Sequence, residues 1–220
     1  HDGPWVEEYR KFEETHTNPD RLVASLFKDK YFILKKVNPK ELMWGMYWVA
    51  SDMQNAETKV SFYDLFKGQE LFDLWQCVNY RFYVGNANHA DGKGIVVANA
   101  KSLLRNILDS ADEAIRKGGI AATLRFGHDG NVIPLVALMQ IENCNVAVSD
   151  PYEVYKVWSD FKVVPMAANV QIIFFRNEKS NDILVKIMHN ENEVHIPVQT
   201  DMFPYYRWRD VENYYRGMLK

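Results

Sequence analysis

The stretch that decides the fold is Ala122-Thr-Leu-Arg-Phe-Gly-His-Asp-Gly-Asn-Val-Ile-Pro-Leu-Val-Ala-Leu-Met139. The apolar run at residues 120–126, which leads into this stretch, predicts a short strand. Residues 131–141 predict a helix after a glycine-flanked turn. Ligands of open α/β sheets bind beyond the carboxyl ends of strands, which is where His128 and Asp129 fall. The order of strand, turn and helix therefore predicts an α/β fold with a candidate site at the turn.

The turn has features that suit an anion such as phosphate. The backbone N–H groups of Gly130, Asn131 and Val132 open the predicted helix, where such groups lack intrahelical partners and the helix dipole favours negative charge. Gly127 and Gly130 allow the backbone to approach a ligand closely. We therefore take this turn as a candidate phosphate-binding site.

Other interpretations remain open when only the pattern is considered. A histidine at the end of a strand is more often a hydrogen-bonded structural residue, and Asp129 is equally well explained as a helix N-cap. Arg125 either points toward a bound phosphate or supports the sheet from its other face, and the supporting role is favoured. The residues alone do not choose between these roles.

The segment Leu124-Arg-Phe-Gly-His-Asp129, followed by Pro134-Leu-Val-Ala-Leu138, closely resembles the C-terminal His-Asp motif of the branch-2 histidine phosphatases. That family includes acid phosphatases, phytases and multiple inositol-polyphosphate phosphatases. The resemblance covers residues 60–220 and extends loosely to the helical start, with bacterial members most similar. Further segments that resemble the family are 99–108, 164–171, 183–188, 193–197 and 205–208.

The resemblance implies a mechanism. In the family, a histidine within an Arg-His-Gly-x-Arg-x-Pro motif attacks the phosphorus and forms a phosphohistidine, while arginines hold the phosphoryl oxygens. By resemblance, His128 contacts the phosphate and Asp129 protonates the leaving alkoxide, before water hydrolyses the phosphohistidine. These roles fit phosphoryl transfer, which depends on positioning and charge neutralisation, and an alkoxide, which leaves poorly without a proton. Gly130 and Asn131 are the expected further substrate-binding residues.

No Arg-His-Gly-x-Arg-x-Pro motif occurs in the 220 residues. The nucleophile and most of the phosphate clamp are therefore expected in an N-terminal half of the same fold that this chain lacks. The abrupt start at His1-Asp2-Gly3-Pro4, which is typical of a loop, supports that expectation. We expect the missing half to be a partner of this chain, and the chain by itself to have no phosphatase turnover.

The remaining pattern predicts a helical cap subdomain at residues 1–95 and the C-terminal part of an α/β phosphatase domain at residues 96–220, with a partial mixed sheet flanked by helices. Asn18-Pro19 and Asn38-Pro39 each predict a helix start, because asparagine caps well and proline suits the first helical position. Further helices are predicted at 61–66, 70–84, 95–117, 150–161 and 210–218, and further strands at 170–175, 183–188 and 194–198.

The composition limits the classes of partner that we expect for this chain. The formal net charge of -3 and the pI near 6.1 give no reason to expect nucleic acid or an anionic membrane surface. No apolar run reaches the roughly 20 residues of a membrane helix, and the first residues do not have the pattern of a signal peptide. A periplasmic or secreted location is implied only by the resemblance. Cys77 and Cys144 are favoured as structural thiols, although one disulfide between them stays open.

Other candidate residues receive weaker roles. His89, in the polar loop 85–94, either helps to line the substrate pocket or belongs to a plain surface loop, and the surface loop is favoured. His189 and His195 are expected to be solvated and His16 to be inert. The histidines show no metal-ligand spacing, so neither a metal nor a cofactor is expected. Three aromatic residues of one helix are expected in the core: Trp44, Tyr47 and Trp48.

Two function hypotheses follow. The first is hydrolysis of phosphate monoesters, of the acid-phosphatase or phytase type, by the complete protein, with phytate or another inositol polyphosphate as a plausible substrate. In it, this chain supplies His128 and Asp129. The second is a non-catalytic binding or assembly module that keeps half of the phosphatase fold. A lone half should expose apolar surface where partner strands belong, whereas a self-contained module should not.

Overall fold

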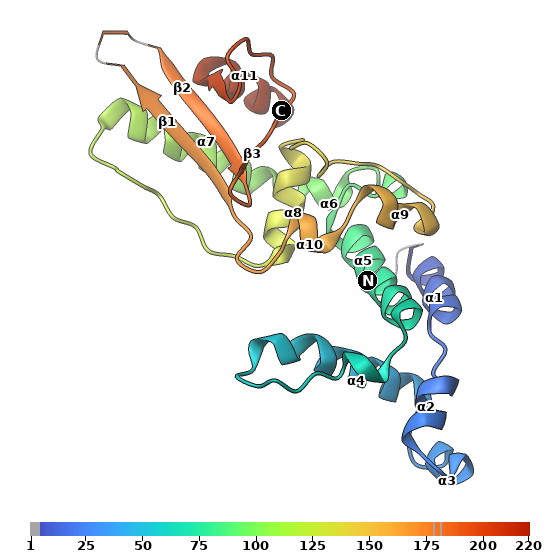
Figure 1. Ribbon diagram of the computed structural model, residues 1–220. Coiled ribbons are helices and arrows are strands. Elements are labelled where there is room, and N and C mark those ends of the chain that lie inside the picture. The colour runs from blue at the N-terminus through green and yellow to red at the C-terminus, as the bar shows by residue number, and fades with distance from the viewer. Residues whose placement is uncertain (1–4, 178, 181) are drawn as a thin grey trace. The chain divides into compact units, whose positions relative to one another are not determined.

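A computed structural model describes residues 5–177, 179–180 and 182–220 (Figure 1). The loop expected at residues 1–4 lies outside the described residues. The chain divides into two compact units, residues 1–81 and residues 82–220. The mixture of helices with a small sheet confirms the predicted α/β class.

The first unit is helical. Its helix α4 begins as its sequence predicts: Pro39 is the first helical residue, and the Asn38 side chain accepts hydrogen bonds from the backbone N–H groups of Lys40 and Glu41. Helix α2 starts one residue later than expected, after Pro19. The elements of this unit are α1 (Trp5–His16), α2 (Asp20–Leu26), α3 (Lys30–Leu34), α4 (Pro39–Asp52), η1 (Met53–Asn55), η2 (Tyr63–Leu65) and the start of α5 (Gly68–Asn86).

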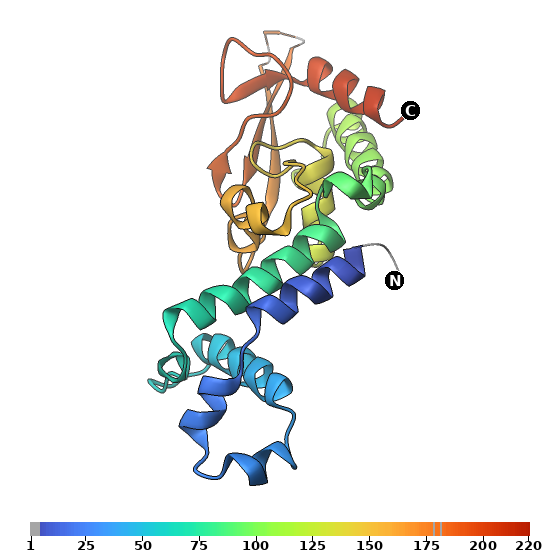
Figure 2. The same cartoon turned by 90° about the vertical axis from the view of Figure 1, so that its right-hand side faces the viewer.

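Two polar side-chain contacts and an apolar core join the helices of the first unit. Helices α1 and α5 lie side by side (Figure 2), and the Tyr80 hydroxyl donates to the Glu8 carboxylate at 2.8 Å. Arg21 of α2 pairs with Glu70 of α5 at 2.5 Å. The core between α2, α4 and α5 contains Leu22, Met43, Tyr47, Ala50, Phe66 and Leu74.

The aromatic cluster of α4 is only partly core. Tyr47 is buried and Trp44 packs partly buried against the core, but Trp48 is 49% exposed, so its predicted core position is wrong. Trp48 follows Trp44 by four residues, which places both on one helix face, and their rings stack with centroids 5.9 Å apart. The Trp48 ring therefore packs on Trp44 at the edge of the core and stays in contact with solvent.

The second unit combines a small antiparallel sheet with helices. β1 (Val170–Arg176) pairs with β2 (Ile183–His189), and β3 (Asn192–Glu193) and β4 (Tyr205–Arg207) also pair with β2. Every pair among the described residues is antiparallel, so the parallel pairs of the expected mixed sheet are not among them. The helices are η3 (Ala90–Gly92), α6 (Ile95–Ala98), α7 (Lys101–Lys117), α8 (Asp129–Leu138), α9 (Pro151–Val157), α10 (Asp160–Val163) and α11 (Trp208–Met218).

Several predicted elements are shorter in the structure. The long helix expected at 95–117 is divided into α6 and α7, and the helix expected at 150–161 is divided into α9 and α10. The second break lies at Trp158, which leaves the helical conformation and is buried against the Tyr83 ring. The strand expected at 194–198 is not formed: β3 ends at Glu193, and only Val194 still bonds to β2, donating its N–H to the Ile187 carbonyl at 3.3 Å.

The strand expected at residues 120–126 is not formed. Gly118 ends α7 with a positive φ of 67°, as predicted, and the chain then runs as an unpaired segment to α8 (Figure 1). All residues from 120 to 130 are exposed, and the side chains of Leu124 and Phe126 are 75% and 95% exposed. A strand needs a neighbour to pair its backbone groups, and this segment has none among the described residues.

Helix α8 is the central element of the second unit. Residues 133–138 are all buried, and the helix contacts both α6 and α7. Just beyond its C-terminal end, the Tyr215 hydroxyl of α11 donates to the Met139 carbonyl at 2.9 Å in a buried position. The predicted helix at 131–141 therefore starts earlier, at Asp129, and ends at Leu138.

Both cysteines are buried free thiols, each within its own unit. Burial raises the pKa of the Cys77 thiol and of the Cys144 thiol to about 12. Because a thiol with such a pKa carries almost no thiolate at neutral pH, neither is a reactive nucleophile. The structural role expected for them is confirmed.

His189 is not solvated, and this expectation is wrong. Its side chain is 7% exposed, with Nε2 2.8 Å from the Val163 carbonyl and Nδ1 3.7 Å from the Cys144 sulfur. Burial lowers the pKa of His189, although the contact with Val163 opposes the shift. The neutral ring thus donates from Nε2 to Val163. By contrast, His195 is exposed, as expected, and stacks on Phe203.

The lowered pKa of His189 predicts an acid-sensitive second unit. Above about pH 6.5 the ring is neutral in both folded and unfolded chains; below it, the unfolded chain binds a proton that the folded chain resists, so stability falls. For one proton the slope is at most about 1.4 kcal/mol per pH unit. Thermal melts between pH 8 and pH 5 should show a smaller decline for His189→Gln than for the wild type. The exposed His195→Gln serves as control, and equal declines in all three proteins would contradict the assignment.

Candidate phosphate site at the start of helix α8

The candidate pair lies at the exposed end of a buried helix. His128 is the N-cap of α8 with extended backbone, and Asp129 is the first helical residue; both side chains are exposed. One Asp129 carboxylate oxygen, Oδ1, accepts the Gly130 N–H at 2.7 Å. The other, Oδ2, has no hydrogen-bond partner within the part of the chain that the structure describes. A buried helix with polar residues only at its start thus presents both side chains to solvent.

The backbone N–H groups at this turn are already used. Gly130 donates to Asp129, and the N–H groups of Asn131 and Val132 both donate to the His128 carbonyl, at 2.9 and 3.1 Å. The expectation that these three donors would be unpaired is therefore not met. A phosphate at this turn would be held by side chains and the helix dipole unless it displaced these local bonds.

The two glycines have different neighbours. A Cβ atom at Gly127 would lie 3.1 Å from the Asn131 side-chain oxygen, tighter than ordinary contacts allow, whereas one at Gly130 would meet the Asn86 side-chain oxygen at an ordinary 3.5 Å. Asn131 Oδ1 also accepts the His128 N–H at 3.1 Å. Gly127 thus permits close packing against Asn131, and the close approach of a ligand stays a prediction.

Asn86 is a site residue that the sequence did not single out. It is the last residue of α5, at the start of the polar loop 85–94, and its side chain lies beside Gly130. The predicted residue of that loop, His89, is instead 5% exposed and packs edge-on against the Tyr83 ring, so its favoured assignment to a surface loop is wrong. Its role in substrate binding stays a prediction. No sequence signal separates Asn86 from the other polar residues of the loop.

Arg125 supports the segment that leads to His128. Its guanidinium donates to the Asn106 side chain and to the Ser110 hydroxyl of α7, both at 2.8 Å. The favoured expectation, support of the sheet from its other face, is therefore wrong: no strand forms at 120–126, and Arg125 joins its segment to helix α7 instead. These hydrogen bonds fix the segment to α7 just before the turn at Gly127.

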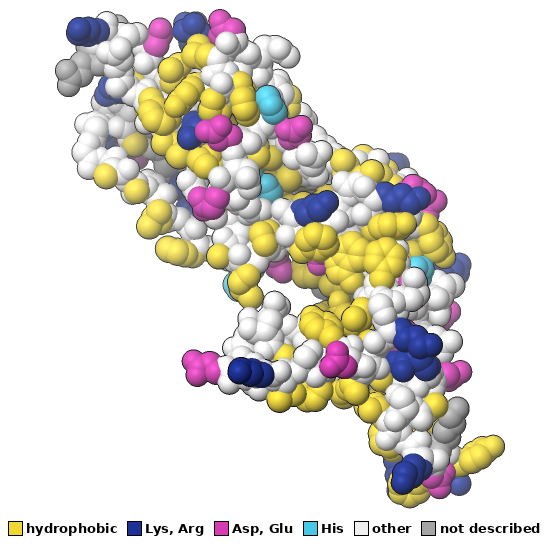
Figure 3. Space-filling model, in the orientation of Figure 1, with side chains coloured by type: hydrophobic (Ala, Val, Ile, Leu, Met, Phe, Trp, Pro, Cys, Tyr) yellow, Lys and Arg dark blue, Asp and Glu magenta, His cyan; other side chains and the backbone are white. Residues whose placement is uncertain are grey.

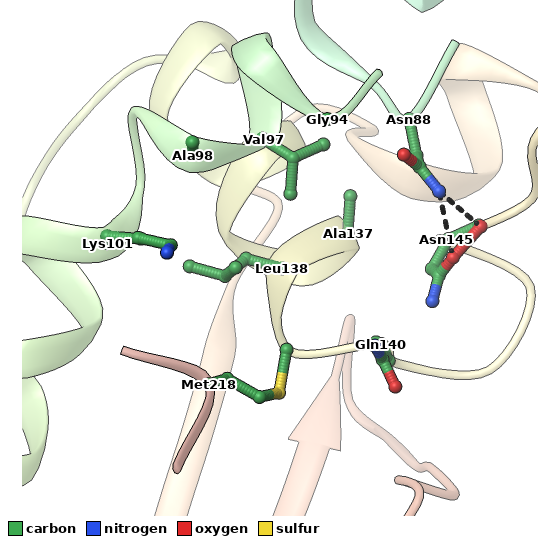
Figure 4. A pocket seen from close by; sticks show the side chains of 10 residues that line it. All are labelled: Asn88, Gly94, Val97, Ala98, Lys101, Ala137, Leu138, Gln140, Asn145 and Met218. Carbon is green, nitrogen blue, oxygen red and sulfur yellow. Dashed lines mark hydrogen bonds between the residues drawn. The ribbon is translucent and has the colours of Figure 1, made fainter. Parts of the chain in front are cut away.

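One pocket of the second unit lies away from this turn. It encloses about 200 Å³ beside the C-terminal end of α8, where Ala137 and Leu138 form part of its wall (Figure 4). Asn88 donates to Asn145 across one side, and Lys101 reaches toward Leu138. Neither His128 nor Asp129 lines this pocket. The residues that line this pocket include no pair of groups suited to acid–base or nucleophilic catalysis. The motif at the other end of α8 therefore remains the candidate site.

Neither the charges on the face shown in Figure 3 nor the metal-binding side chains of the described residues mark a second site. On the face shown in Figure 3, Lys and Arg side chains are interspersed with Asp and Glu rather than gathered into one basic area. Within residues 5–177, 179–180 and 182–220, no group of three His, Cys, Asp or Glu side chains is arranged to hold a metal ion. No helix in the same residues is long and apolar enough to cross a membrane.

The sequence model of the histidine phosphatase superfamily (branch 2) matches residues 6–190. The chain belongs to this family. The match covers both units and includes the His128-Asp129 motif, so the family assignment made from the motif is confirmed. No curated protein sequence matches the chain.

Solved structures of one bacterial relative share the fold. The multiple inositol polyphosphate phosphatase of Bifidobacterium longum superposes with a TM-score of 0.66 in its apo form, at 22% identity over 79% of this chain. Its complex with phosphate gives 0.68 at 22% identity over 83%, and its complex with inositol hexasulfate gives 0.66 at 24% over 80%. The chain spans only 38% to 40% of the length of these structures.

Proposed function

We propose that this chain supplies the second half of the active site of a histidine phosphatase that hydrolyses phosphate monoesters. In this proposal His128 contacts the phosphate, Asp129 protonates the leaving alkoxide, and the attacking histidine comes from a half of the fold outside these 220 residues. The observation that carries it is the exposed His128-Asp129 pair at the start of buried helix α8, in a chain of this family. An unpaired Asp129 oxygen suits proton donation.

The unpaired segment 118–128 supports a missing partner half. Among the described residues its backbone pairs with no strand, and its apolar side chains Leu124 and Phe126 face solvent. In Figure 3, hydrophobic side chains line the edge that this segment follows. A strand placed beside it would pair its backbone and cover these side chains. The same exposure weighs against a self-contained, non-catalytic module.

A covalent intermediate provides the direct test. We expect the complete protein to release inorganic phosphate from phosphate monoesters and, when stopped rapidly in alkali, to carry protein-bound phosphate. Phosphohistidine withstands alkali and hydrolyses in acid, so the label should be lost on acidification. Phosphate release without any acid-labile label on the protein would contradict the proposed nucleophilic mechanism.

Inositol polyphosphates are the substrate class that we propose for the complete protein. The support is the likeness to a phosphatase of that name and to its complex with inositol hexasulfate. Since this chain gathers no dense basic area on the face shown, most cationic contacts to such a substrate are assigned to the other half. A panel of phosphomonoesters checks this: we expect kcat/KM to be highest for the inositol polyphosphates, and equal values across the panel would remove the substrate assignment.

A periplasmic or secreted location is also part of the proposal, and it rests on the family resemblance alone. Fractionation of cells that express the complete protein checks it. Recovery of the protein in the cytoplasmic fraction would contradict it.

A further inference from the structure

We propose that Asn131 is a positioning residue for His128, and that Gly127 is required because Asn131 occupies the space beside it. This inference rests on the proposed function, since it concerns how the phosphate-binding histidine is held. It assigns Asn131 a role through its side-chain oxygen, toward the protein's own backbone, in place of the substrate contact that the family resemblance implies.

The first observation is the hydrogen bond from the His128 N–H to Asn131 Oδ1, at 3.1 Å. The reverse direction is also present, because the Asn131 N–H donates to the His128 carbonyl at 2.9 Å. The Asn131 side chain thus supplies one half of a capping box, and the backbone bond from the Asn131 N–H closes the first turn of the helix. His128 is thus held at both its N–H and its carbonyl by the same residue.

The second observation is the contact with Gly127. A Cβ atom there would meet Asn131 Oδ1 at 3.1 Å and Asn131 Cβ at 3.4 Å, so the Asn131 side chain would have to shift by a few tenths of an ångström from the place where it accepts the His128 N–H. The alternative reason for a glycine, a positive φ, does not apply, because Gly127 is not among the residues with positive φ. The need for glycine therefore comes from the Asn131 side chain.

The third observation is that the turn has few other supports. Residues 120–130 are exposed, and Arg125 is bonded to α7 two residues before Gly127. Between that attachment and the buried part of α8, the Asn131 side chain spans the turn. Loss of the Oδ1 bond would free the backbone of the histidine whose ring must meet a phosphoryl group, and a misplacement of about 1 Å can cost on the order of 100-fold in rate.

The test compares four variants of the complete protein: Asn131→Ala, Asn131→Asp, Gly127→Ala and the double variant Gly127→Ala/Asn131→Ala. We expect Asn131→Ala to reduce kcat roughly 10- to 100-fold with a smaller change in KM. Asn131→Asp keeps an oxygen acceptor and should recover kcat. If Asn131 acted through its amide N–H groups on the substrate, Ala and Asp would both fail, and the effect would fall on KM; that result would overturn the inference.

The glycine variants give an independent readout. Gly127→Ala alone should reduce kcat about as much as Asn131→Ala, whereas it should cost little more once Asn131 is already alanine, because the clash with Oδ1 is gone. Such non-additivity is the signature of two residues acting through one contact. Gly217→Ala in α11, where an added Cβ meets no atom within 4 Å, is the matched control. Strictly additive effects of Gly127→Ala and Asn131→Ala would overturn the inference.

Amide hydrogen exchange separates this inference from the proposed function. The His128 N–H should be protected in the wild type and in Asn131→Asp, and should exchange faster in Asn131→Ala and Gly127→Ala. This measurement needs no activity, so it holds even if Asp129 proves to have no part in turnover. Unchanged exchange at His128 in Asn131→Ala would show that the bond does not hold the turn, and the inference would fail while the proposed function stood.

Discussion

Asp129→Asn in the complete protein is expected to abolish most hydrolysis of alkyl phosphates while sparing substrates with good leaving groups. An alkoxide needs a proton as it departs, and a positioned general acid contributes about 10²- to 10⁴-fold to such a step. Asparagine matches the shape of the aspartate and its Oδ1 acceptor for Gly130, but it has no acidic proton to give. We therefore expect a loss of about 10²- to 10⁴-fold in kcat on an alkyl phosphate.

The leaving group makes this experiment specific. A p-nitrophenolate departs without protonation, so the same variant should retain far more of its activity on p-nitrophenyl phosphate. Asp201→Asn is the control, because Asp201 is an exposed carboxylate of the same unit, outside the α8 turn. A similar loss on both substrates would indicate damage to binding or folding, and no loss on either would remove Asp129 from the mechanism.

The 220-residue chain alone is expected to release no phosphate, and adding the half that bears the Arg-His-Gly motif should restore turnover. The physical reason is that no such nucleophile motif occurs in the chain, while segment 118–128 leaves an apolar strand sequence unpaired. The isolated chain should also bind a hydrophobic dye or self-associate, because unpaired apolar segments do so. Phosphate release by the pure chain, abolished by Asp129→Asn, would contradict this prediction.

Phe126→Ser tests with a single side chain whether a partner strand covers segment 118–128. Phe126 is 95% exposed, so in the isolated chain its loss should change the free energy of unfolding by less than about 0.5 kcal/mol. In the complete protein the ring would be covered, and its loss should cost about 1.5 to 3 kcal/mol. Chemical denaturation of both forms measures the difference. Equal effects in the two forms would mean that no partner strand covers the segment.

Local signals in this sequence predict where helices begin, but they do not determine the pairing between distant segments. The helix after Asn38-Pro39 begins as predicted because capping involves only neighbouring residues. The apolar run at 120–126 has the composition of a strand, but a strand exists only with a partner, and none is among the described residues. The family motif found the His128-Asp129 pair, whereas the approach of Asn86 to Gly130 depends on tertiary packing.

Two of the missed features had signals in the sequence. His189 follows Val185 and Ile187 at a spacing of two, so strand alternation places all three on one face, and all three are buried. Asn131 stands three residues after His128, the spacing at which an N-cap residue and its helix exchange hydrogen bonds. For His189, the period of the strand predicts burial correctly and the polarity of the side chain does not.

The contact between α7 and α11 bears on how the second unit folds. Arg216 of α11 binds Asp109 and Asp112 of α7, which stand 107 and 104 residues before it in the chain. Contacts between such distant residues must overcome the entropy of closing a long loop, and they slow folding. During synthesis, α7 therefore waits for almost the whole of its unit to be translated before α11 can pair with it. Folding of this unit is then expected to follow translation rather than accompany it.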